Sequence, residues 1–328
     1  MFSVAHKGAS IMLTWGSAGI ASFRQAHLIH NPCAGRIRRN PELLKEALGL
    51  LSPLATDWTT HATTGPGDAT RLAAESVAAG ADLVVALGGD GTINEVIQGM
   101  AGTSAALGIL PAGTANVLAV ETGIGGNLAR AARAMPGFEP AEIHLGRLQT
   151  GQADPRWFAV MAGVGLDARI VRRVQPGFKR RFGKLSYWVA GFGAVGETLP
   201  EFAVRLDGRD FRASFALFSR VKNYGGDLEI ARHASLLRDD LAVVLFEGES
   251  TFRYLKYFTG VLLNRLPRMK GVHVLHCREA ELVPLNGRPV DLQMDGEYAG
   301  LAPARISIGT RTVRLLLPRK FLNARPKP

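Results

Sequence analysis

The sequence has few cysteines, no long apolar run and a deficit of acidic residues. Its two cysteines, Cys33 and Cys277, lie far apart in a chain of 328 residues, which excludes a disulfide framework or a CxxC metal site and favours a reducing compartment. No run of 18 or more apolar residues occurs, so no transmembrane helix is expected. The 28 acidic residues are outnumbered by 39 lysines and arginines. This excess predicts an anionic partner: a nucleotide, a nucleic acid or an acidic membrane surface.

Signatures of nucleic-acid recognition are also missing. No RRM, KH, zinc-finger or helix-turn-helix pattern occurs, and the apolar segments of the second half lack interleaved surface aromatics. Among the anionic partners, the sequence therefore favours a nucleotide or a membrane, and no nucleic-acid partner is expected.

The first half of the chain alternates apolar strands with helical periodicity. Hydrophobic residues make up 47% of the chain, which is enough for a buried core, and the length suggests two domains. The expected strands are 26–32, 83–87 and 106–110, and the expected helices are 41–50, 68–79 and 93–100. This alternation predicts parallel strands with helices on the faces of the sheet.

Short alternating segments fill the second half and are typical of antiparallel strands. The predicted fold class is α/β plus β-rich: an N-terminal parallel-sheet nucleotide-binding domain at 24–146, then an antiparallel β-sandwich domain at 147–321, with the active site in the cleft between them. The last strand, 311–318, is expected to return to the first domain. Residues 1–23 are a poor match to a signal peptide and are expected to be a disordered leader, and 322–328 a tail.

A glycine-rich segment joins one of the strands to the next helix. In "VVALGGDGTINEVIQGM" (Val84–Met100), Gly88, Gly89 and Gly91 follow the apolar strand directly. Glycines let the backbone turn tightly and approach a phosphate without a Cβ clash, and the helix that follows offers free N–H groups and the positive end of its dipole. The segment therefore predicts a phosphate-binding loop.

Polar residues inside this loop point the same way. Asp90 lies among the glycines, where a carboxylate would be repelled by phosphates unless a divalent cation such as Mg²⁺ lay between them. Thr92 and Asn94 could donate to phosphate or ribose oxygens. The alternative is a glycine-rich turn that serves geometry only, but such a turn has no use for Asp90.

Two standard nucleotide fingerprints do not fit. The glycines of the loop do not have GxGxxG spacing, and "GFKRRFGKL" has five residues between its glycines and Leu185 where a P-loop needs Ser or Thr. The site is therefore expected to be neither a Rossmann fingerprint nor a Walker loop.

Taken together, "GGDGTINEV" (Gly88–Val96) and "LPAGTANVLA" (Leu110–Ala119) resemble the diacylglycerol kinase catalytic domain family, the soluble lipid kinases that include sphingosine kinases. The resemblance covers roughly residues 26–320, and its motifs come in the family's order. The others are "NPCAG" at 31–35, Thr63 before "GDA", "GVGLDA" at 163–168, the Asn-Tyr-Gly-Gly segment at Asn223, "LLRDDL" at 236–241 and "DGE" at 295–297. GGDGT alone also occurs in NAD kinases, so it indicates a kinase-type nucleotide site rather than a substrate.

The resemblance implies that ATP binds in the cleft between the domains. The residues implied are Asn31, Pro32, Cys33, Ala34, Gly35, Thr63, Gly88, Gly89, Asp90, Gly91, Thr92, Ile93, Asn94, Glu95, Gly113 and Thr114.

For catalysis, the resemblance implies that Glu297 is the general base that takes the proton from a lipid hydroxyl. Asp295 lies beside it, and Asp90 helps to hold Mg·ATP. The chemistry agrees, because phosphoryl transfer needs little beyond positioning, Mg²⁺ and one carboxylate near the attacking hydroxyl. An alternative remains open, since Asp-Gly is a good hairpin turn and this motif could simply join two strands.

The family also carries a second, structural metal site. The matching residues are Asp239, through its side chain, and Leu236 and Leu241, through their carbonyls, a set of hard oxygens that suits Mg²⁺. The sequence departs from the family at Asp240, where a glycine usually follows the first aspartate. His273 and His276 are three apart in an expected strand, hence on opposite faces, and are interpreted as structural.

A basic segment follows the "GVGLDA" motif. Its cations are Arg169, Arg172, Arg173, Lys179, Arg180, Arg181 and Lys184, and the aromatics Tyr187, Trp188 and Phe192 come directly after them. Cations followed by interfacial aromatics suit contact with anionic lipid headgroups, although many charge runs are merely solvated.

These observations predict a cytoplasmic, peripherally membrane-associated kinase that uses ATP and Mg²⁺ to phosphorylate a hydroxyl of a membrane lipid such as a diacylglycerol or a sphingoid base. Two alternatives remain. One is an NAD kinase, and the other is a non-catalytic module that binds a nucleotide or a membrane. The sequence leaves the lipid and the oligomeric state open.

Overall fold

The computed structural model describes residues 23–173, 198–224, 229–250, 256, 257, 260, 261 and 265–324. The first strand begins at Phe23, so only residues 1–22 of the expected leader lie outside the described chain. Most of the expected basic segment also lies outside it, from Lys179 through Phe192.

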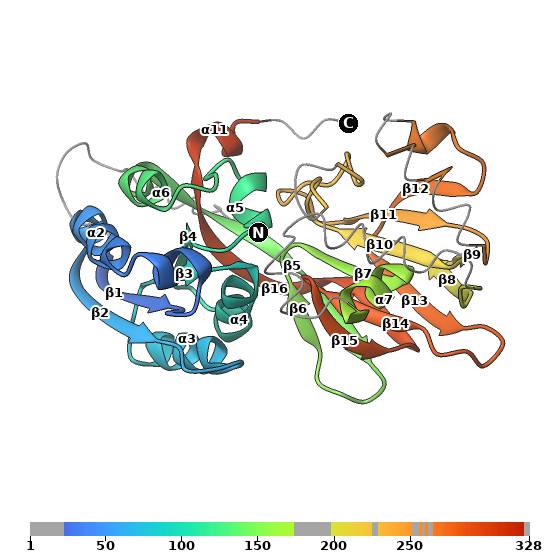
Figure 1. The fold of residues 1–328 in the computed structure, drawn as a ribbon, viewed down its shortest axis with the longest axis horizontal. Helices are drawn as coiled ribbons and strands as arrows, with labels where there is room; N and C mark the ends of the chain where they lie inside the picture. Colours follow the sequence, from blue (N-terminus) through green and yellow to red (C-terminus); the bar gives the residue numbers. More distant parts are fainter. Residues whose placement is uncertain are drawn as a thin grey trace, which may run out of the picture.

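Parallel strands with helices on both faces form the first domain, as predicted. The strands are β1 Phe23–His30, β2 Ala55–Ala62, β3 Leu83–Gly88 and β4 Ala106–Pro111. The helices are α1 Gly35–Arg39, α2 Glu42–Leu51, α3 Asp68–Ala78, α4 Asp90–Met100, α5 Val117–Glu121 and α6 Leu128–Ala134, with short 3-10 turns at Ser52–Leu54 and Met135–Gly137. In Figure 1, α2 and α6 lie on one side of the sheet and α3 and α4 on the other.

The burial of β3 and β4 explains their sequence. Every residue of both strands is buried, because central strands of a parallel sheet are covered on both faces and therefore read as continuous apolar runs. The helix expected from Ile93 begins three residues earlier, at Asp90, with Gly89 as its N-cap. The glycine-rich segment is thus partly the first turn of α4 rather than a loop ahead of it.

Antiparallel strands build the second domain. They are β5 Phe138–Thr150, β6 Arg156–Phe158, β7 Met161–Gly165, β8 Phe202–Leu206, β9 Arg209–Ala213, β10 Phe215–Ser219, β11 Leu241–Phe246, β12 Val272–Cys277, β13 Glu279–Pro284, β14 Asp291–Met294, β15 Glu297–Leu301 and β16 Ala304–Pro318. Helix α7 spans Leu166–Arg173, α11 spans Arg319–Leu322, and a 3-10 turn spans Leu266–Arg268.

Two sheets face each other in this domain. One has the order β12-β11-β10-β7-β14-β15, and the other contains β16, β13, β8 and β9, with β5 and β6 paired beside β16. Buried apolar side chains from both sheets, such as Phe158, Phe202 and Phe218, pack in one core. The predicted class, a parallel α/β domain followed by an antiparallel sandwich, is confirmed.

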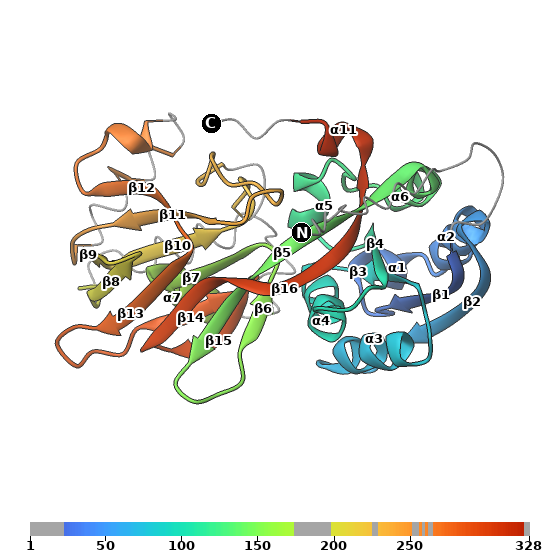
Figure 2. The ribbon, with the colours of Figure 1, turned by 180° about the vertical axis from the view of Figure 1, so that it is seen from behind.

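The long strands β5 and β16 connect the two domains. They pair antiparallel along almost their whole length, and the last part of β16 pairs in parallel with β4, with Arg314 opposite Ala106. One sheet therefore continues from β2 of the first domain to β9 of the second. Both views show β5 and β16 crossing the middle of the molecule (Figures 1 and 2). No helix in the described part of the chain is long and apolar enough to cross a bilayer.

Candidate functional site

The carboxyl ends of the parallel strands bring the predicted nucleotide residues together. The Asn31 N–H donates to the carbonyl of Leu87 (3.0 Å), and the Ala112 N–H donates to that of Gly88 (2.8 Å), so the segments after β1, β3 and β4 lie side by side. The Thr63 N–H is bound to the carbonyl of His30 (2.9 Å) in the same way. In open α/β sheets, ligands bind at this edge.

Polar side chains join the first of these segments to α4. The Asn31 side-chain NH₂ donates to Thr92 Oγ1 (3.3 Å), while Asn31 Oδ1 accepts from the Cys33 N–H (2.8 Å). The "NPCAG" and "GGDGT" motifs, far apart in the sequence, therefore meet at the N-terminus of α4, where free N–H groups and the helix dipole favour an anion.

The glycines of the site allow segments to approach closely. A Cβ on Gly88 would lie 2.5 Å from the Thr92 side chain, and a Cβ on Gly113 would lie 2.6 Å from Gly89 Cα. None of these three glycines has a positive φ. Their role is thus the close contact of the β3–α4 and β4–α5 connections, and no left-handed backbone is needed there.

Asp90 fastens the second of these connections. Its Oδ2 accepts from the Asn116 N–H (2.9 Å) and its Oδ1 from the Val117 N–H (2.6 Å), at the start of α5. Asn116 adopts a left-handed backbone with φ 49° and accepts from the Gly113 N–H through Oδ1 (2.9 Å). Each carboxylate oxygen has a further lone pair, so the predicted role of Asp90 with Mg·ATP stays compatible with these bonds.

The second domain contributes a carboxylate to the same place. Glu297 is the first residue of β15, and its side chain is exposed. A Cβ added to Gly91 would lie 3.1 Å from Glu297 Oε1, so this carboxylate reaches the first turn of α4. The two residues are 206 positions apart in the sequence, and only the fold places them together.

Asp295 and Gly296 form a tight hairpin turn before Glu297. Both have positive φ (49° and 83°), as a two-residue turn between β14 and β15 requires. Asp295 Oδ1 accepts from the N–H groups of Val160 (3.1 Å) and Met161 (2.8 Å), and Oδ2 from that of Ala159 (3.2 Å). The motif therefore forms the hairpin turn that one sequence interpretation predicts, and Glu297 follows it at the start of β15. The catalytic role of Glu297 stays a prediction.

The electrostatics of Asp295 reflect its surroundings. Burial raises the pKa of the Asp295 carboxyl to about 7, the three N–H donors oppose this shift, and the negative charge of Asp90 adds to it. The carboxyl groups of Asp90 and Asp295 are therefore close enough to repel each other, an arrangement that suits a bound cation.

A buried network of polar side chains is hydrogen-bonded to the β14–β15 turn. The sequence alone assigned no role to the residues of this network. Asp167 is 0% exposed, accepts from the Tyr224 hydroxyl and accepts from Gln293 Nε2 (2.6 Å). Gln293 Oε1 in turn accepts from the Gly296 N–H (2.9 Å). Asp167 thus orients Gln293, which holds the turn that carries Glu297. The only available signal was its position inside "GVGLDA".

The stability of the fold should depend on the protonation of Asp167. Burial raises the pKa of Asp167 from 3.8 to about 6, so the folded protein binds this proton more tightly than the unfolded chain does. Its contribution to stability is then complete below about pH 4 and is lost as the pH rises through about 6, a change of about 3 kcal/mol. Asp167→Asn, which does not ionise, should therefore gain stability relative to the wild type by this amount between pH 4 and 7.

Urea unfolding of both proteins across this pH range measures the difference. Asp57→Asn, at an exposed position of β2, controls for the loss of one charge. A difference in unfolding free energy between the wild type and Asp167→Asn that stayed constant with pH would contradict the prediction.

A second unforeseen contact links the domains. Glu121, the last residue of α5, accepts through Oε2 from the N–H groups of Lys222 (3.0 Å) and Asn223 (3.4 Å) and from Asn223 Nδ2 (3.0 Å). Burial raises the pKa of this carboxyl, against the lowering effect of the donors. The segment Lys222–Tyr224 is therefore attached both to α5 and, through Asp167 and Gln293, to the β14–β15 turn.

Two of the three residues of the predicted second metal site have other partners. The Leu236 carbonyl accepts from Arg220 Nη2 (2.7 Å), and Asp239 Oδ2 is paired with Arg278 Nη1 (2.8 Å). Leu241 is the first residue of β11. Within the described residues, no group of three or more His, Cys, Asp or Glu side chains could hold a metal ion. His273 and His276 face Glu247 (2.7 Å) and Asp240 (3.2 Å).

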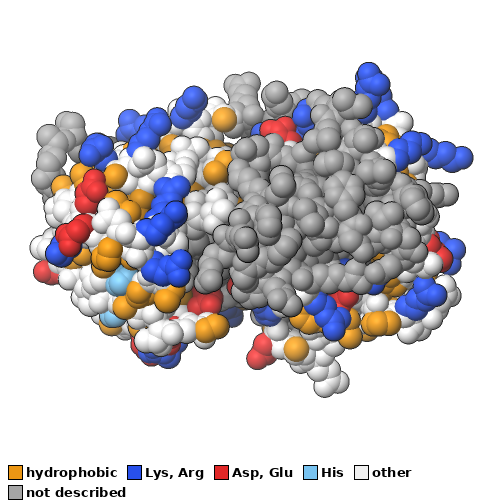
Figure 3. Space-filling view, in the orientation of Figure 1, with side chains coloured by type: hydrophobic (Ala, Val, Ile, Leu, Met, Phe, Trp, Pro, Cys, Tyr) orange, Lys and Arg blue, Asp and Glu red, His pale blue; other side chains and the backbone are white. Residues whose placement is uncertain are grey.

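Only the start of the basic segment is described. Arg169 and Arg172 lie on α7, and Arg172 Nη1 pairs with Asp291 (2.9 Å) while its guanidinium lies over the Tyr298 ring, 5.4 Å from the centroid. In Figure 3, lysine and arginine side chains lie at several separate places on the described surface.

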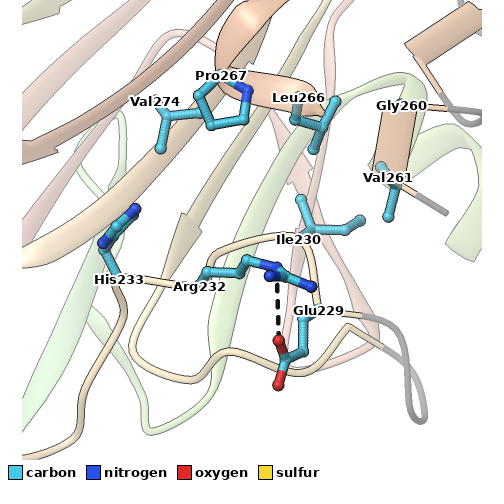
Figure 4. A pocket seen from close by; sticks show the side chains of 9 residues that line it. All are labelled: Glu229, Ile230, Arg232, His233, Gly260, Val261, Leu266, Pro267 and Val274. Carbon is cyan, nitrogen blue, oxygen red and sulfur yellow. Dashed lines mark ion pairs between the residues drawn. The ribbon is translucent and has the colours of Figure 1, made fainter. Parts of the chain in front are cut away.

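A small pocket lies elsewhere in the second domain (Figure 4). An ion pair between Arg232 and Glu229 (3.5 Å) lies along it. The other lining residues are Ile230, His233, Gly260, Val261, Leu266, Pro267 and Val274. None of them belongs to the candidate site, which lies where α4 meets the β14–β15 turn.

Comparisons with known proteins agree with the observed fold. The family model of the diacylglycerol kinase catalytic domain matches residues 25–148, and that of the YegS C-terminal NAD kinase beta sandwich-like domain matches residues 160–317. The first matched range ends inside β5 and the second begins just before β7, so residues 149–159 lie between them.

Relatives match over most of their length. A diacylglycerol kinase of Mycobacterium tuberculosis (strain ATCC 25618 / H37Rv) is 30% identical over 77% of this chain and 82% of its own. A diacylglycerol kinase of Bacillus subtilis (strain 168) is 28% identical over 90% and 97%. A probable lipid kinase, YegS-like, of Xanthomonas oryzae pv. oryzae (strain MAFF 311018) is 28% identical over 84% and 91%. A crystal structure of a diacylglycerol kinase from Bacillus anthracis str. Sterne shares the fold, with a TM-score of 0.71 at 19% identity over 91% of this chain and 98% of that one.

Proposed function

Because this chain belongs to the diacylglycerol kinase family, we propose that it transfers the γ-phosphate of ATP to a hydroxyl group of a membrane lipid. The observation that carries this proposal is the position of Glu297. A carboxylate from the second domain lies at the first turn of α4, beside the glycines of the first domain. A phosphate donor and a hydroxyl acceptor brought from opposite sides would meet there.

The first domain supplies the groups that would hold ATP. The N-terminal N–H groups of α4 and its dipole attract phosphate oxygens, and Thr92 and Asn31, already joined by a hydrogen bond, add donors beside them. Gly89 and Gly113 bring the two backbone connections together, so both connections can lie beside the same anion. Thr114 lies in the second of these connections.

The carboxylates fit a divalent cation. Burial raises the pKa of Asp295, and the charge of Asp90 adds to this shift. A hard cation near both carboxylates would remove their repulsion. Asp90 and Asp295 would therefore hold Mg²⁺, which neutralises phosphate charge in kinases and is usually bound by one or two carboxylates together with the phosphates.

Glu297 would act on the acceptor. In the proposed reaction its carboxylate accepts the proton of the lipid hydroxyl as the hydroxyl oxygen attacks the γ-phosphate and the bond to the β-phosphate oxygen breaks, which leaves ADP. Asp295 and Gln293 keep the turn in place through hydrogen bonds to the backbone. The hydrogen bonds from Gln293 Nε2 to Asp167 and from the Gly296 N–H to Gln293 Oε1 limit how far Glu297 can move.

The surface beside Glu297 supports contact with an anionic membrane. Tyr298 and Leu301 on β15 are large apolar residues that are 43% and 45% exposed, and Arg172 lies over the Tyr298 ring. A cation and exposed apolar side chains next to the base suit an interface with lipid headgroups. The protein would thus bind the membrane peripherally and take its lipid at this edge.

A phosphate-transfer assay tests the proposal. Protein is incubated with Mg²⁺ and γ-labelled ATP in mixed micelles that contain diacylglycerol, a sphingoid base or phosphatidylglycerol, with NAD run in parallel. We expect label in one lipid class, and diacylglycerol is the first candidate because several relatives carry that name. Label in NAD alone would replace this proposal by NAD kinase activity, and ATP binding without any transfer would favour a non-catalytic module.

Vesicle flotation tests the membrane contact. Binding to vesicles with phosphatidylserine should exceed binding to pure phosphatidylcholine vesicles and should weaken as salt is raised. Equal binding to both compositions would contradict an electrostatic contribution.

A further inference from the structure

A buried arginine from another part of the chain contacts the loop that carries the predicted second metal site. Arg220 follows β10, and its side chain is 0% exposed. Its Nη2 donates to the carbonyl of Leu236 (2.7 Å), and its Nη1 donates to the carbonyl of Asp240 (2.6 Å). One guanidinium group therefore joins both ends of the "LLRDD" segment to the end of a central strand of the sandwich.

The guanidinium and a metal ion would compete for the same oxygen. The Leu236 carbonyl is one of the two carbonyls that the resemblance assigns to the metal. A Mg²⁺ ion needs oxygen ligands at about 2.0–2.1 Å in octahedral arrangement. A cationic guanidinium at hydrogen-bond distance from this carbonyl fills that space and repels a second positive charge.

The only side-chain ligand of the predicted set points away from the segment's interior. The Asp239 side chain is 60% exposed and is paired with Arg278. The neighbouring Asp240 carboxylate is held by Arg238 Nε (2.9 Å) and by His276 Nδ1 (3.2 Å). Both carboxylates of the segment thus already have basic partners, and neither joins Leu236 in a ligand set.

We propose that Arg220 takes the place of the structural divalent cation in this protein. Its guanidinium cross-links the Leu236–Asp240 segment to β10, and the second domain needs no bound metal there. The residues present do not fit the family's second metal site, and the departure at Asp240 goes together with this replacement. The inference concerns the second domain alone and does not depend on the proposed catalysis.

The group keeps its charge at neutral pH. The guanidinium of an arginine is not deprotonated in proteins. Like a metal ion, the guanidinium therefore supplies a permanent positive charge to the inward-facing carbonyls, and two directional hydrogen bonds take the place of coordination bonds.

Thermal unfolding of the nucleotide-free, full-length protein tests this replacement. The melting temperature is measured with EDTA and with Mg²⁺ up to about 10 mM, a concentration far above what a tight structural site needs, for the wild type and for Asp239→Asn. We expect that Mg²⁺ gives no stabilisation that depends on Asp239. A rise of several degrees in the wild type that disappears in Asp239→Asn would place a metal on this segment and overturn the proposal.

Substitution of the arginine itself gives the second measurement. Arg220→Met keeps most of the side-chain length but leaves both carbonyls without a donor, so the melting temperature should fall by about 10 °C. Arg212→Met, at an exposed position of β9, is the matched control and should change little. Equal melting temperatures for the two variants would overturn the proposal, and if Arg220→Met does not fold, the Mg²⁺ titration of the wild type still decides.

Discussion

Glu297→Gln should lower the rate of phosphate transfer by about 10²–10⁴-fold, the usual contribution of a general base. Glutamine has the same size but cannot accept the proton of the lipid hydroxyl. The Kd for ATP should change by less than about 2-fold, because the groups proposed to bind ATP belong to the first domain. Loss of the base should therefore lower turnover without weakening ATP binding. The measurements are kcat with the lipid that accepts label and the Kd for ATP by calorimetry.

Glu46→Gln is the matched control for this substitution. Glu46 lies on α2 with an exposed side chain, so the same chemical change there should leave kcat unaltered. If Glu297→Gln retained wild-type kcat, Glu297 would not be the base, and the position of its carboxylate at α4 would need another explanation. If it lost ATP binding as well as turnover, Glu297 would contribute to the nucleotide site instead.

Gly113→Ala should reduce kcat/KM for ATP by about 10²-fold, the cost of a misplacement of about 1 Å near reacting groups. The new Cβ would lie 2.6 Å from Gly89 Cα and 2.9 Å from Asn116 Oδ1. The Cα of Gly89 is a backbone atom at the N-cap of α4, so it cannot move away from the new Cβ unless the N-terminus of the helix shifts as well. Overpacking of this kind should also cost about 1–3 kcal/mol of stability.

Gly49→Ala separates this contact from the general effect of replacing a glycine. Gly49 lies inside α2, and an added Cβ would meet nothing within 4 Å. Alanine should therefore stabilise the helix there by roughly 0.5–1 kcal/mol without changing kcat/KM. Wild-type kcat/KM in Gly113→Ala would contradict a close contact between the two connections in the working enzyme.

Much of the fold could be predicted from the sequence because local patterns carry it. The apolar runs of β3 and β4 and the helical periodicity before them indicated a parallel sheet. The Asp295–Gly296 dipeptide indicated a tight turn, and the structure has one, with positive φ at both residues. These features depend on neighbours in the chain, so periodicity and turn chemistry suffice.

The candidate site was predictable only in part. The glycine segment indicated an anion site by itself, and the family resemblance implied the role of Glu297, but only the fold places Gly91 beside Glu297. The purpose of the glycines was also incompletely predicted, since Gly88, Gly89 and Gly113 serve close contact between segments without left-handed backbone. A sequence does not state which other segment will pass close to a glycine.

Arg220 illustrates what no local pattern could supply. In the sequence it is one of 39 basic residues, and basic residues are mostly exposed. Only the tertiary structure buries it against the carbonyls of Leu236 and Asp240. Asp167 is similar, because its partners Tyr224 and Gln293 are distant in the chain.

The sequence by itself determined the alternation of strands and helices around β1, β3 and β4, the turn that carries Glu297 and the glycine-rich start of α4, because each follows from the preferences of adjacent residues. It did not predict β2. The tertiary structure alone decided which charged groups lose water and which partners they meet. Desolvation and charge pairing depend on segments that come together from distant parts of the chain, and they set the raised pKa values of Asp167 and Asp295 and the burial of Arg220.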